Sequence, residues 1–217
     1  MVAANVGTNN VSVLLGVGNG SFGAKVDFAT GSAPKGVALG DMNSDGDLDI
    51  VTANAQSNNV SVLLGTGSGS FGAPQNFATA RNPEAVVVAD LNGDGDLDIS
   101  AVGKYTVGYG GSSKMSVLLS DGAGGFDPRV EYTPGTQPTS VAAADVTGDG
   151  ISDLLTANRF DGSVSLFPGT GGGAFGAPAV LPIGYGTTPT TLALGDLNED
   201  GSPDVVTANG NGTVAAL

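Results

Sequence analysis

Residues 41–49 read DMNSDGDLD, and three later stretches of nine residues repeat this pattern in the same chain. They are DLNGDGDLD at 90–98, DVTGDGISD at 145–153 and DLNEDGSPD at 196–204. Their first residues are separated by 49, 55 and 51 positions. Self-similarity at a spacing of about 50 residues is typical of repeat architectures. We therefore expect the chain to be built from copies of one structural unit of about 50 residues.

Two further landmarks recur in step with the acidic stretches. One is a glycine-rich turn that carries an aromatic residue, at Phe22, Phe71, Phe126 and Phe175. The other is a proline seven residues before each acidic stretch, at Pro34, Pro83, Pro138 and Pro189. The one long interval is explained by an insertion in 103–113. One phenylalanine per repeat at a fixed place is expected to pack between neighbouring repeats.

Each repeat predicts four short β-strands. In the first full repeat they are 37–40, 48–54, 59–65 and 75–79, which are apolar or β-branched runs separated by Gly, Asn and Pro. Such spacing fits an antiparallel meander, and no helical period is found. We therefore predict an all-β fold, a β-propeller or partial β-propeller of four-stranded antiparallel blades. A flat solenoid is the alternative.

The chain divides into a single propeller-type domain over 1–217. We expect a partial blade at 1–30, repeats at about 31–79, 80–133 and 134–182, and an incomplete last repeat at 183–217. Residues 206–217 align with 2–13, so the chain is about four repeats plus a duplicated overlap. Either it is part of a longer propeller, or its N-terminal strands complete the last blade and close a small ring. An open end exposes a strand edge and would favour self-association.

The amino-acid composition excludes several classes of partner and of chemical site. The 217 residues carry 7 Lys and Arg against 21 Asp and Glu, a formal charge of −14, which argues against nucleic acid as a partner. The absence of His and Cys excludes disulfides, thiol nucleophiles, His-based triads and zinc sites built from nitrogen or sulfur. No apolar run approaches the length that spans a membrane, so no insertion is expected.

The nine-residue pattern has the chemistry of a calcium loop. Oxygen side chains at positions 1, 3, 5 and 9 and the backbone carbonyl at position 7 can face one point, and Gly at position 6 permits the turn. The expected side-chain ligands are Asp41, Asn43, Asp45 and Asp49; Asp90, Asn92, Asp94 and Asp98; Asp145, Thr147, Asp149 and Asp153; and Asp196, Asn198, Asp200 and Asp204. The expected carbonyl ligands belong to Asp47, Asp96, Ile151 and Ser202.

Oxygen-only donors favour calcium over zinc or copper, and an all-protein cage disfavours magnesium, so up to four Ca²⁺ ions are expected. The loops are not EF-hands, because position 12 is Thr52 in the first loop and never Glu in the others. The alternative is that they are solvated Asp/Asn/Gly turns. Fifteen of the 21 acidic residues lie in the four loops, so calcium would remove much self-repulsion.

The DxNxDGDLD loop, the apolar strand after it and the downstream SFGAP resemble the FG-GAP/VCBS repeats of integrin α-subunit propellers and related bacterial secreted proteins. This resemblance implies calcium in the loops, a role in adhesion or in protein or glycan recognition, and an extracellular or cell-surface location. A saturated cage leaves little room for substrate, so no enzyme activity is expected. The alternatives are a propeller domain of a secreted polysaccharide-degrading enzyme and a ligand-free engineered or excised repeat fragment.

The face opposite the acidic loops gathers most of the irregular chain. A meander places the second-to-third turns and the links between blades there, including the 103–113 insertion. Tyrosine and arginine are frequent in binding hot spots, and loops carry function. The candidate ligand-binding residues are Arg81, Lys104, Tyr105, Tyr109, Arg159, Phe160 and Tyr185. Ordinary surface decoration is the alternative for this face.

Overall fold

The computed structural model describes residues 1–104, 113–184 and 186–217, and every regular element in these ranges is a β-strand. Within them no helix is long and apolar enough to cross a membrane. The candidate ligand residues Tyr105, Tyr109 and Tyr185 lie outside the described residues.

Three complete sheets of four antiparallel strands form the middle of the molecule. The first has β4 (Pro34–Gly40), β5 (Asp49–Asn54), β6 (Asn59–Leu63) and β7 (Gln75–Ala78). The second has β8 (Pro83–Ala89), β9 (Asp98–Gly103), β10 (Lys114–Leu118) and β11 (Val130–Tyr132). The third has β12 (Pro138–Ala144), β13 (Asp153–Asn158), β14 (Ser163–Phe167) and β17 (Ala179–Pro182).

A three-stranded sheet lies at each end. The N-terminal sheet has β1 (Val2–Asn5), β2 (Asn10–Val13) and β3 (Val26–Ala29). The C-terminal sheet has β18 (Pro189–Gly195), β19 (Asp204–Asn209) and β20 (Val214–Ala216). The fourth glycine-rich turn adds a small hairpin that the sequence did not predict, formed by β15 (Gly169–Gly171) and β16 (Ala174–Phe175).

The predicted fold class is confirmed, because each complete repeat is a four-stranded antiparallel meander. The strands begin and end within three residues of the predicted bounds in the first full repeat. Their burial follows their place in the sheet. All six residues of β5, β9 and β13 are buried, while the outer strands β7 and β11 are mostly exposed.

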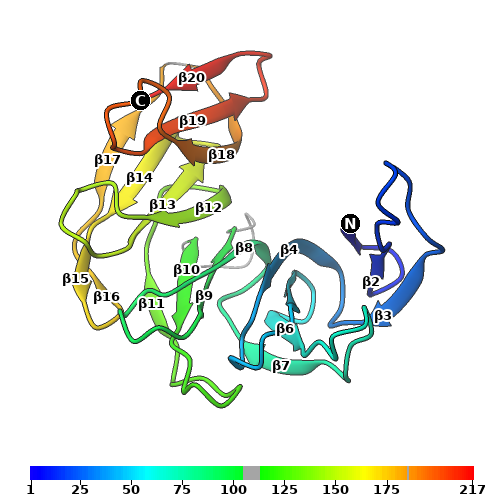
Figure 1. Ribbon diagram of the computed structural model, residues 1–217. Coiled ribbons are helices and arrows are strands. Elements are labelled where there is room, and N and C mark those ends of the chain that lie inside the picture. Colours follow the sequence, from blue (N-terminus) through cyan, green and yellow to red (C-terminus); the bar gives the residue numbers. More distant parts are fainter. Residues whose placement is uncertain (105–112, 185) are drawn as a thin grey trace.

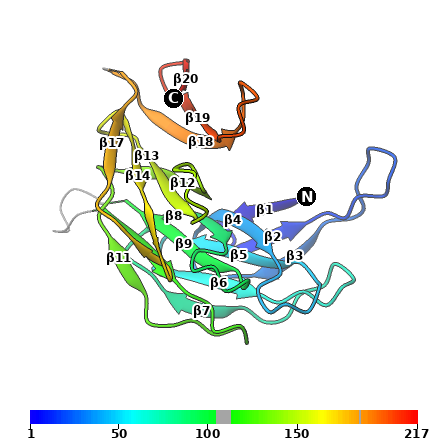
Figure 2. The same cartoon turned by 60° about the vertical axis from the view of Figure 1, so that its left-hand side comes forward.

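The sheets are arranged around an axis in propeller fashion and not stacked as a flat solenoid. The first strands of successive sheets, β4, β8, β12 and β18, lie next to one another. Figures 1 and 2 show the five sheets following one another along an open arc, with the N-terminal and C-terminal sheets at its two ends. Among the described strands, β1 pairs only with β2 and β18 only with β19, so the arc is not closed by strand pairing.

The hydrophobic core lies between the sheets. Met42 and Val60 of one sheet form a cluster with Ile99 and Leu118 of the next. The backbones also approach closely at the axis, since a Cβ on Gly36 would stand 2.9 Å from the Cα of Ala85. A repeat therefore buries its apolar residues mainly against its neighbours.

Candidate metal centres

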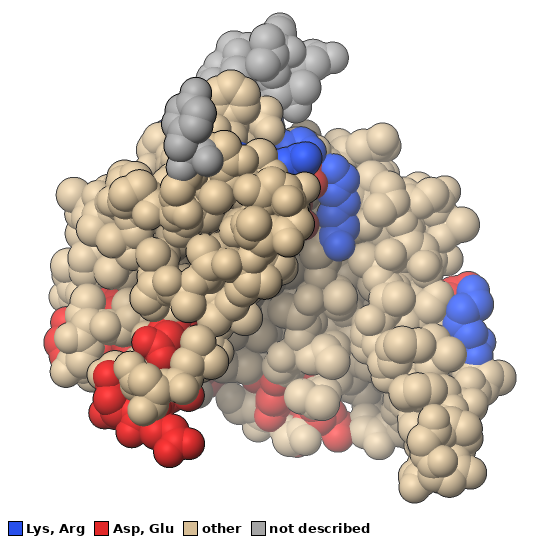
Figure 3. All heavy atoms as spheres, turned by 90° about the horizontal axis from the view of Figure 1, so that it is seen from above, with Lys and Arg blue, Asp and Glu red and all other residues tan. Residues whose placement is uncertain are grey.

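The four acidic stretches occupy equivalent places in the fold. Each begins one residue after the first strand of a sheet ends, and its ninth residue begins the second strand. All four therefore lie at the same end of their sheets. Figure 3 shows most of the visible Asp and Glu atoms along one edge of the molecule, and most of the visible Lys and Arg atoms away from it.

The backbone takes the same unusual path in every loop. The residue at position 4 has a positive φ in all four, and so has the glycine at position 6. At position 4 the residues are Ser44 (58°), Gly93 (85°), Gly148 (74°) and Glu199 (63°). At position 6 they are Gly46 (90°), Gly95 (94°), Gly150 (83°) and Gly201 (91°). Non-glycine residues reach the left-handed region near 60°, as Ser44 and Glu199 do, whereas the φ of 83–94° at position 6 lies beyond it and explains why this position is always glycine.

The carboxylate at position 1 accepts backbone hydrogen bonds from later residues of its own loop. One of its oxygens accepts a hydrogen bond from the backbone N–H at position 6 in every loop, at 2.8–3.0 Å. The carboxylate at position 5 in turn accepts the N–H of position 7, at 2.8–2.9 Å. These donors lower the pKa of Asp45, Asp145 and Asp200. These three carboxylates are therefore ionised near neutral pH.

The carboxylate at position 9 differs from the other three ligand candidates because it is built into the sheet. Asp49 and Asp98 are completely buried. In Asp49 one oxygen accepts the N–H of Met42 at 2.7 Å and the other accepts the N–H of Gly65 at 2.6 Å. In Asp98 the donors are Leu91, at 2.9 Å, and Ser120, at 2.8 Å. The carboxylate at position 9 thus accepts hydrogen bonds both from its own loop and from the start of the glycine-rich turn.

The environment of these buried carboxylates bears on metal binding. Burial raises the pKa of Asp49 and of Asp98, and the two backbone donors partly oppose it. The carboxylates at positions 5 and 1 raise it further by repulsion. Positions 1, 5 and 9 are therefore close enough to interact electrostatically, and a cation among them would reverse the sign of that interaction.

The ligand candidates are brought into one loop each but do not converge on one point. In the described part of the chain, no three Asp or Glu side chains form a group that would hold a metal ion as they stand. The side chain at position 3 lies against position 5: the amide of Asn43 donates to Asp45 at 2.8 Å, and that of Asn92 donates to Asp94 at 2.8 Å. In this arrangement the side-chain oxygens of the loop accept hydrogen bonds from N–H groups of the same loop.

The side chain at position 7 points elsewhere. A Cβ on Gly67 would come within 2.8 Å of a carboxylate oxygen of Asp47, and one on Gly122 within 2.5 Å of Asp96. These two aspartates therefore lie over the glycine-rich turns, as expected if position 7 offers only its carbonyl to a metal. Asp96 also accepts a hydrogen bond from Ser44 of the preceding loop at 3.0 Å.

The aromatic turns pack between sheets, with one exception. Phe71 meets Phe28 edge to face at 5.1 Å between ring centroids, and Phe126 meets Phe77 at 4.7 Å. Phe175 meets Tyr132 at 5.5 Å. In each pair one ring belongs to the outer strand of the preceding sheet. Phe22 belongs to the N-terminal sheet and is 52% exposed, so the expected role as inter-sheet core holds for the other three only.

Among the described candidates of the opposite face, Lys104 forms an ion pair. Lys104 pairs with Glu84 at 3.0 Å, and Lys35 of the preceding sheet pairs with the same carboxylate at 2.5 Å. Lys104 therefore joins a bridge between two sheets. The remaining described candidates, Arg81, Arg159 and Phe160, are exposed.

A buried polar network at this end was missed from the sequence. Thr52 donates to the side chain of Asn54 at 3.0 Å, and Asn54 donates to Ser61 at 2.8 Å. Equivalent bonds join Thr156, Asn158 and Ser165 in the third complete sheet. The signal was present, because the tripeptide TAN recurs at 52–54, 156–158 and 207–209. The second complete sheet instead has Ala101 and Gly103 at the Thr and Asn positions.

Solved structures show the same fold at low sequence identity. BBS1N in complex with ARL6DN aligns at a TM-score of 0.57 and 13% identity, over 86% of this chain and 54% of the matched one. The V. cholerae biofilm matrix protein Bap1 aligns at a TM-score of 0.51 and 21% identity, over 94% of this chain and 29% of the matched chain. A functionally unknown protein from Desulfotomaculum acetoxidans aligns at a TM-score of 0.50 and 11% identity, over 100% of this chain and 78% of the matched chain. This chain thus spans about half or less of the length of the first two matched chains.

Sequence comparison identifies the repeats themselves. No curated protein sequence matches the chain. A family model, described as an FG-GAP-like repeat, matches residues 1–52, 41–100, 105–156 and 145–207. These matches cover nearly all of the sequence, and each includes an acidic loop or a glycine-rich aromatic turn. The chain belongs to the FG-GAP-like repeat family.

Proposed function

We propose that this chain is a calcium-stabilised, non-enzymatic β-propeller module that recognises a protein or glycan ligand outside the cell. The observation that carries the calcium part is the fourfold recurrence of one loop. Residue types, positive φ angles and backbone hydrogen bonds all repeat at the same positions. A solvated turn needs acceptors for these hydrogen bonds, but amide or hydroxyl oxygens would also serve at positions 1 and 5, where every copy has aspartate.

The residues fit a calcium ion by donor chemistry. Every side chain at positions 1, 3, 5 and 9 offers oxygen, and Ca²⁺ takes six to eight oxygen ligands from carboxylates, amides and carbonyls. A carboxylate oxygen that accepts one N–H keeps a lone pair for a cation. In the first loop Asp41, Asn43, Asp45 and Asp49 would hold the ion, together with the carbonyl of Asp47. Bound there, the ion supplies positive charge that offsets the clustered carboxylates.

The role outside the cell follows from the strength expected of such loops. Extracellular calcium modules bind with dissociation constants of about 10⁻⁴–10⁻³ M, which suits the calcium concentration there. Recognition is assigned to the face opposite the loops, where Arg159 and the largely exposed Phe160 lie together in the chain. An exposed aromatic beside an arginine has the composition of a binding hot spot.

Calcium binding is tested by titration calorimetry together with thermal unfolding. We expect up to four ions to bind and the melting temperature to rise with calcium and fall again with EDTA. Asp45→Asn should lose one ion, because position 5 is a ligand. Asp47→Asn makes the same change of charge at position 7, which offers only its carbonyl, and should keep all ions. Absence of any calcium-dependent shift, or equal losses in both variants, would contradict the proposal.

Recognition is tested separately, with calcium present. We expect saturable binding on a glycan array or to an extracellular protein, and no depolymerisation of polysaccharides. The double variant Arg159→Ala and Phe160→Ala should weaken binding, while Lys25→Ala, in an exposed pair with Asp27, should not. Turnover of a polysaccharide would favour the enzymatic alternative instead.

A further inference from the structure

Four asparagines of this chain are followed directly by a glycine. They are Asn19, Asn92, Asn209 and Asn211. Glycine has no side chain to shield its backbone nitrogen, so that nitrogen can attack the side-chain amide carbon of the asparagine before it. The sequence makes the four pairs alike in this respect. The structure separates them by what holds the glycine N–H and by what contacts the asparagine side chain.

At three of the four pairs the glycine N–H is held by an acceptor. The N–H of Gly93 donates to the carboxylate at loop position 1, at 2.7 Å. The N–H of Gly210 donates to the carbonyl of Thr188 at 2.8 Å, and that of Gly212 donates to the carbonyl of Asn209 at 3.0 Å. Attack by any of these nitrogens first requires that its hydrogen bond be broken.

Gly20 differs from the other three glycines. In the part of the chain that the structure describes, no group accepts a hydrogen bond from its N–H, and both Asn19 and Gly20 are exposed to water. The same is true of the N–H groups of Gly69 and Gly124, which stand two residues before the aromatic ring in the next two turns. The free N–H therefore belongs to this place in the turn, whichever sheet carries it.

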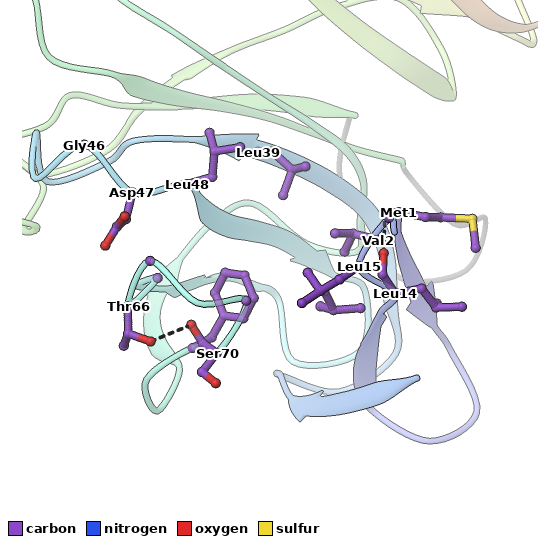
Figure 4. A pocket seen from close by; sticks show the side chains of 16 residues that line it. Met1, Val2, Leu14, Leu15, Leu39, Gly46, Asp47, Leu48, Thr66 and Ser70 are labelled. Carbon is purple, nitrogen blue, oxygen red and sulfur yellow. Dashed lines mark hydrogen bonds between the residues drawn. The ribbon is translucent and has the colours of Figure 1, made fainter. Parts of the chain in front are cut away.

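The turn is closed at its base, and its tip lies beyond the closing bond. The N–H of Val17 donates to the carbonyl of Ser21 at 3.1 Å, and that of Thr66 donates to the carbonyl of Ser70 at the same distance. Figure 4 shows the second of these turns, where the hydroxyl of Thr66 also donates to that carbonyl, at 3.2 Å. Asn19 lies within the tip, so its surroundings are set by the turn itself.

The side chain of Asn19 is prepared for attack at its amide carbon. Its Oδ1 accepts the N–H of Ser21 at 3.1 Å and the hydroxyl of the same serine at 2.6 Å. Two donors on this oxygen stabilise the negative charge that it acquires when a nitrogen adds to the carbon, as an oxyanion hole does. Asn211 has an equivalent pair of donors from Thr213, at 3.2 and 2.7 Å. Asn19 and Asn211 thus differ chiefly in whether the next N–H is free.

We propose that Asn19 is a site of spontaneous deamidation, which the fold leaves open while it protects the other three asparagines. The nitrogen of Gly20 gives its proton to hydroxide and bonds to the amide carbon of Asn19. The bond from that carbon to the side-chain nitrogen breaks, and the nitrogen takes up a proton and leaves as ammonia. Water then opens the cyclic imide at either carbonyl, which gives aspartate or isoaspartate. One amide becomes one carboxylate, so the chain gains one negative charge.

The test compares the four asparagines in the folded and in the unfolded chain. The full chain is incubated at mildly alkaline pH, either with calcium or in urea with EDTA, and is then digested. Mass spectrometry identifies the converted residue, and chromatography separates aspartate from isoaspartate. In the folded chain Asn19 should convert about tenfold faster than Asn211, because only the latter must first lose a hydrogen bond. In urea the two rates should be similar, since both residues precede glycine.

Equal rates at Asn19 and Asn211 in the folded chain would overturn the proposal. So would a tenfold difference that persists in urea, because the sequence and not the fold would then decide which residue reacts.

Variants of the turn test the roles of the two side chains. Ser21→Ala removes one donor from the amide oxygen and should slow the conversion several-fold, while Ser21→Thr keeps the hydroxyl and should keep the rate. Asn19→Gln should abolish the more acidic form on ion exchange, because the longer side chain closes its ring much more slowly. All three residues are exposed, so melting temperatures should not change. An unchanged rate in Ser21→Ala, or an acidic form that persists in Asn19→Gln, would contradict the proposal.

Discussion

The complete sheets and the end sheets are built from the same repeat, yet they bury different fractions of it. Phe175 is 8% exposed against the neighbouring Tyr132, whereas Phe22, at the same place in the N-terminal sheet, is half exposed. Leu91 is buried at loop position 2, and Leu197 is exposed. The difference teaches that a residue's contribution is set by the sheet beside it, because the core lies between the repeats.

The largest effect is expected from removing the packed aromatic ring. Phe175→Ala should lower the free energy of unfolding by about 3–5 kcal/mol, since it opens a cavity between sheets. Phe22→Ala should cost roughly a fifth of that, because much of its ring is already in water. Urea unfolding of both variants measures the contrast. Similar losses would mean that the N-terminal sheet is covered in solution.

A smaller effect is expected at loop position 9. Asp98→Asn should cost about 2 kcal/mol in EDTA, because an amide nitrogen cannot accept one of the two backbone hydrogen bonds. Asp204 accepts a single bond in the described structure, from Leu197, so Asp204→Asn should cost less. Thermal unfolding in EDTA separates this structural role from metal binding. Equal shifts would show that the second hydrogen bond adds nothing.

The smallest expected effect is a gain in stability. The hydroxyl of Ser100 is the one buried side-chain polar atom in the described structure that has no hydrogen-bond partner. The equivalent residue is Val51 in the first complete sheet and Leu155 in the third. Ser100→Val should therefore raise stability by about 1 kcal/mol, and Val51→Ser should lower it. A loss of stability in Ser100→Val would mean that the hydroxyl is satisfied in solution.

The spacing of the sequence landmarks was sufficient to predict the fold class, an all-β propeller-type array of four-stranded antiparallel sheets. Repeats determine strands and loops through local chemistry, such as the glycine at loop position 6. The role of Asp49 as a buried acceptor could not be predicted, because the sequence pattern of a metal ligand and that of a buried acceptor both contain a carboxylate. The exposure of Phe22 was missed for a different reason, since it depends on a neighbouring sheet and not on the repeat itself.

The TAN tripeptide was missed because none of its residues carries acid, base or metal chemistry that would distinguish it. Thr and Asn at the end of a strand read as ordinary turn residues in a single copy. Three copies in register identify a structural network, since buried amides must be satisfied. The recurrence that singled out the four acidic loops would also have identified this network.

The missing network in the second complete sheet also has an evolutionary consequence. Its Gly103 stands so close to the carbonyl oxygen of Arg81, 2.2 Å from where a Cβ would be, that asparagine has no place there. The second complete sheet thus lacks the Thr and Asn side chains of the network, and it is the repeat in which the chain has extra residues, at 103–113. We expect foreign peptides to be displayed between Lys104 and Ser113 with little change in melting temperature, and to be rejected between Ser57 and Asn58. New binding specificities would then arise at this one corner while the propeller scaffold stays unchanged.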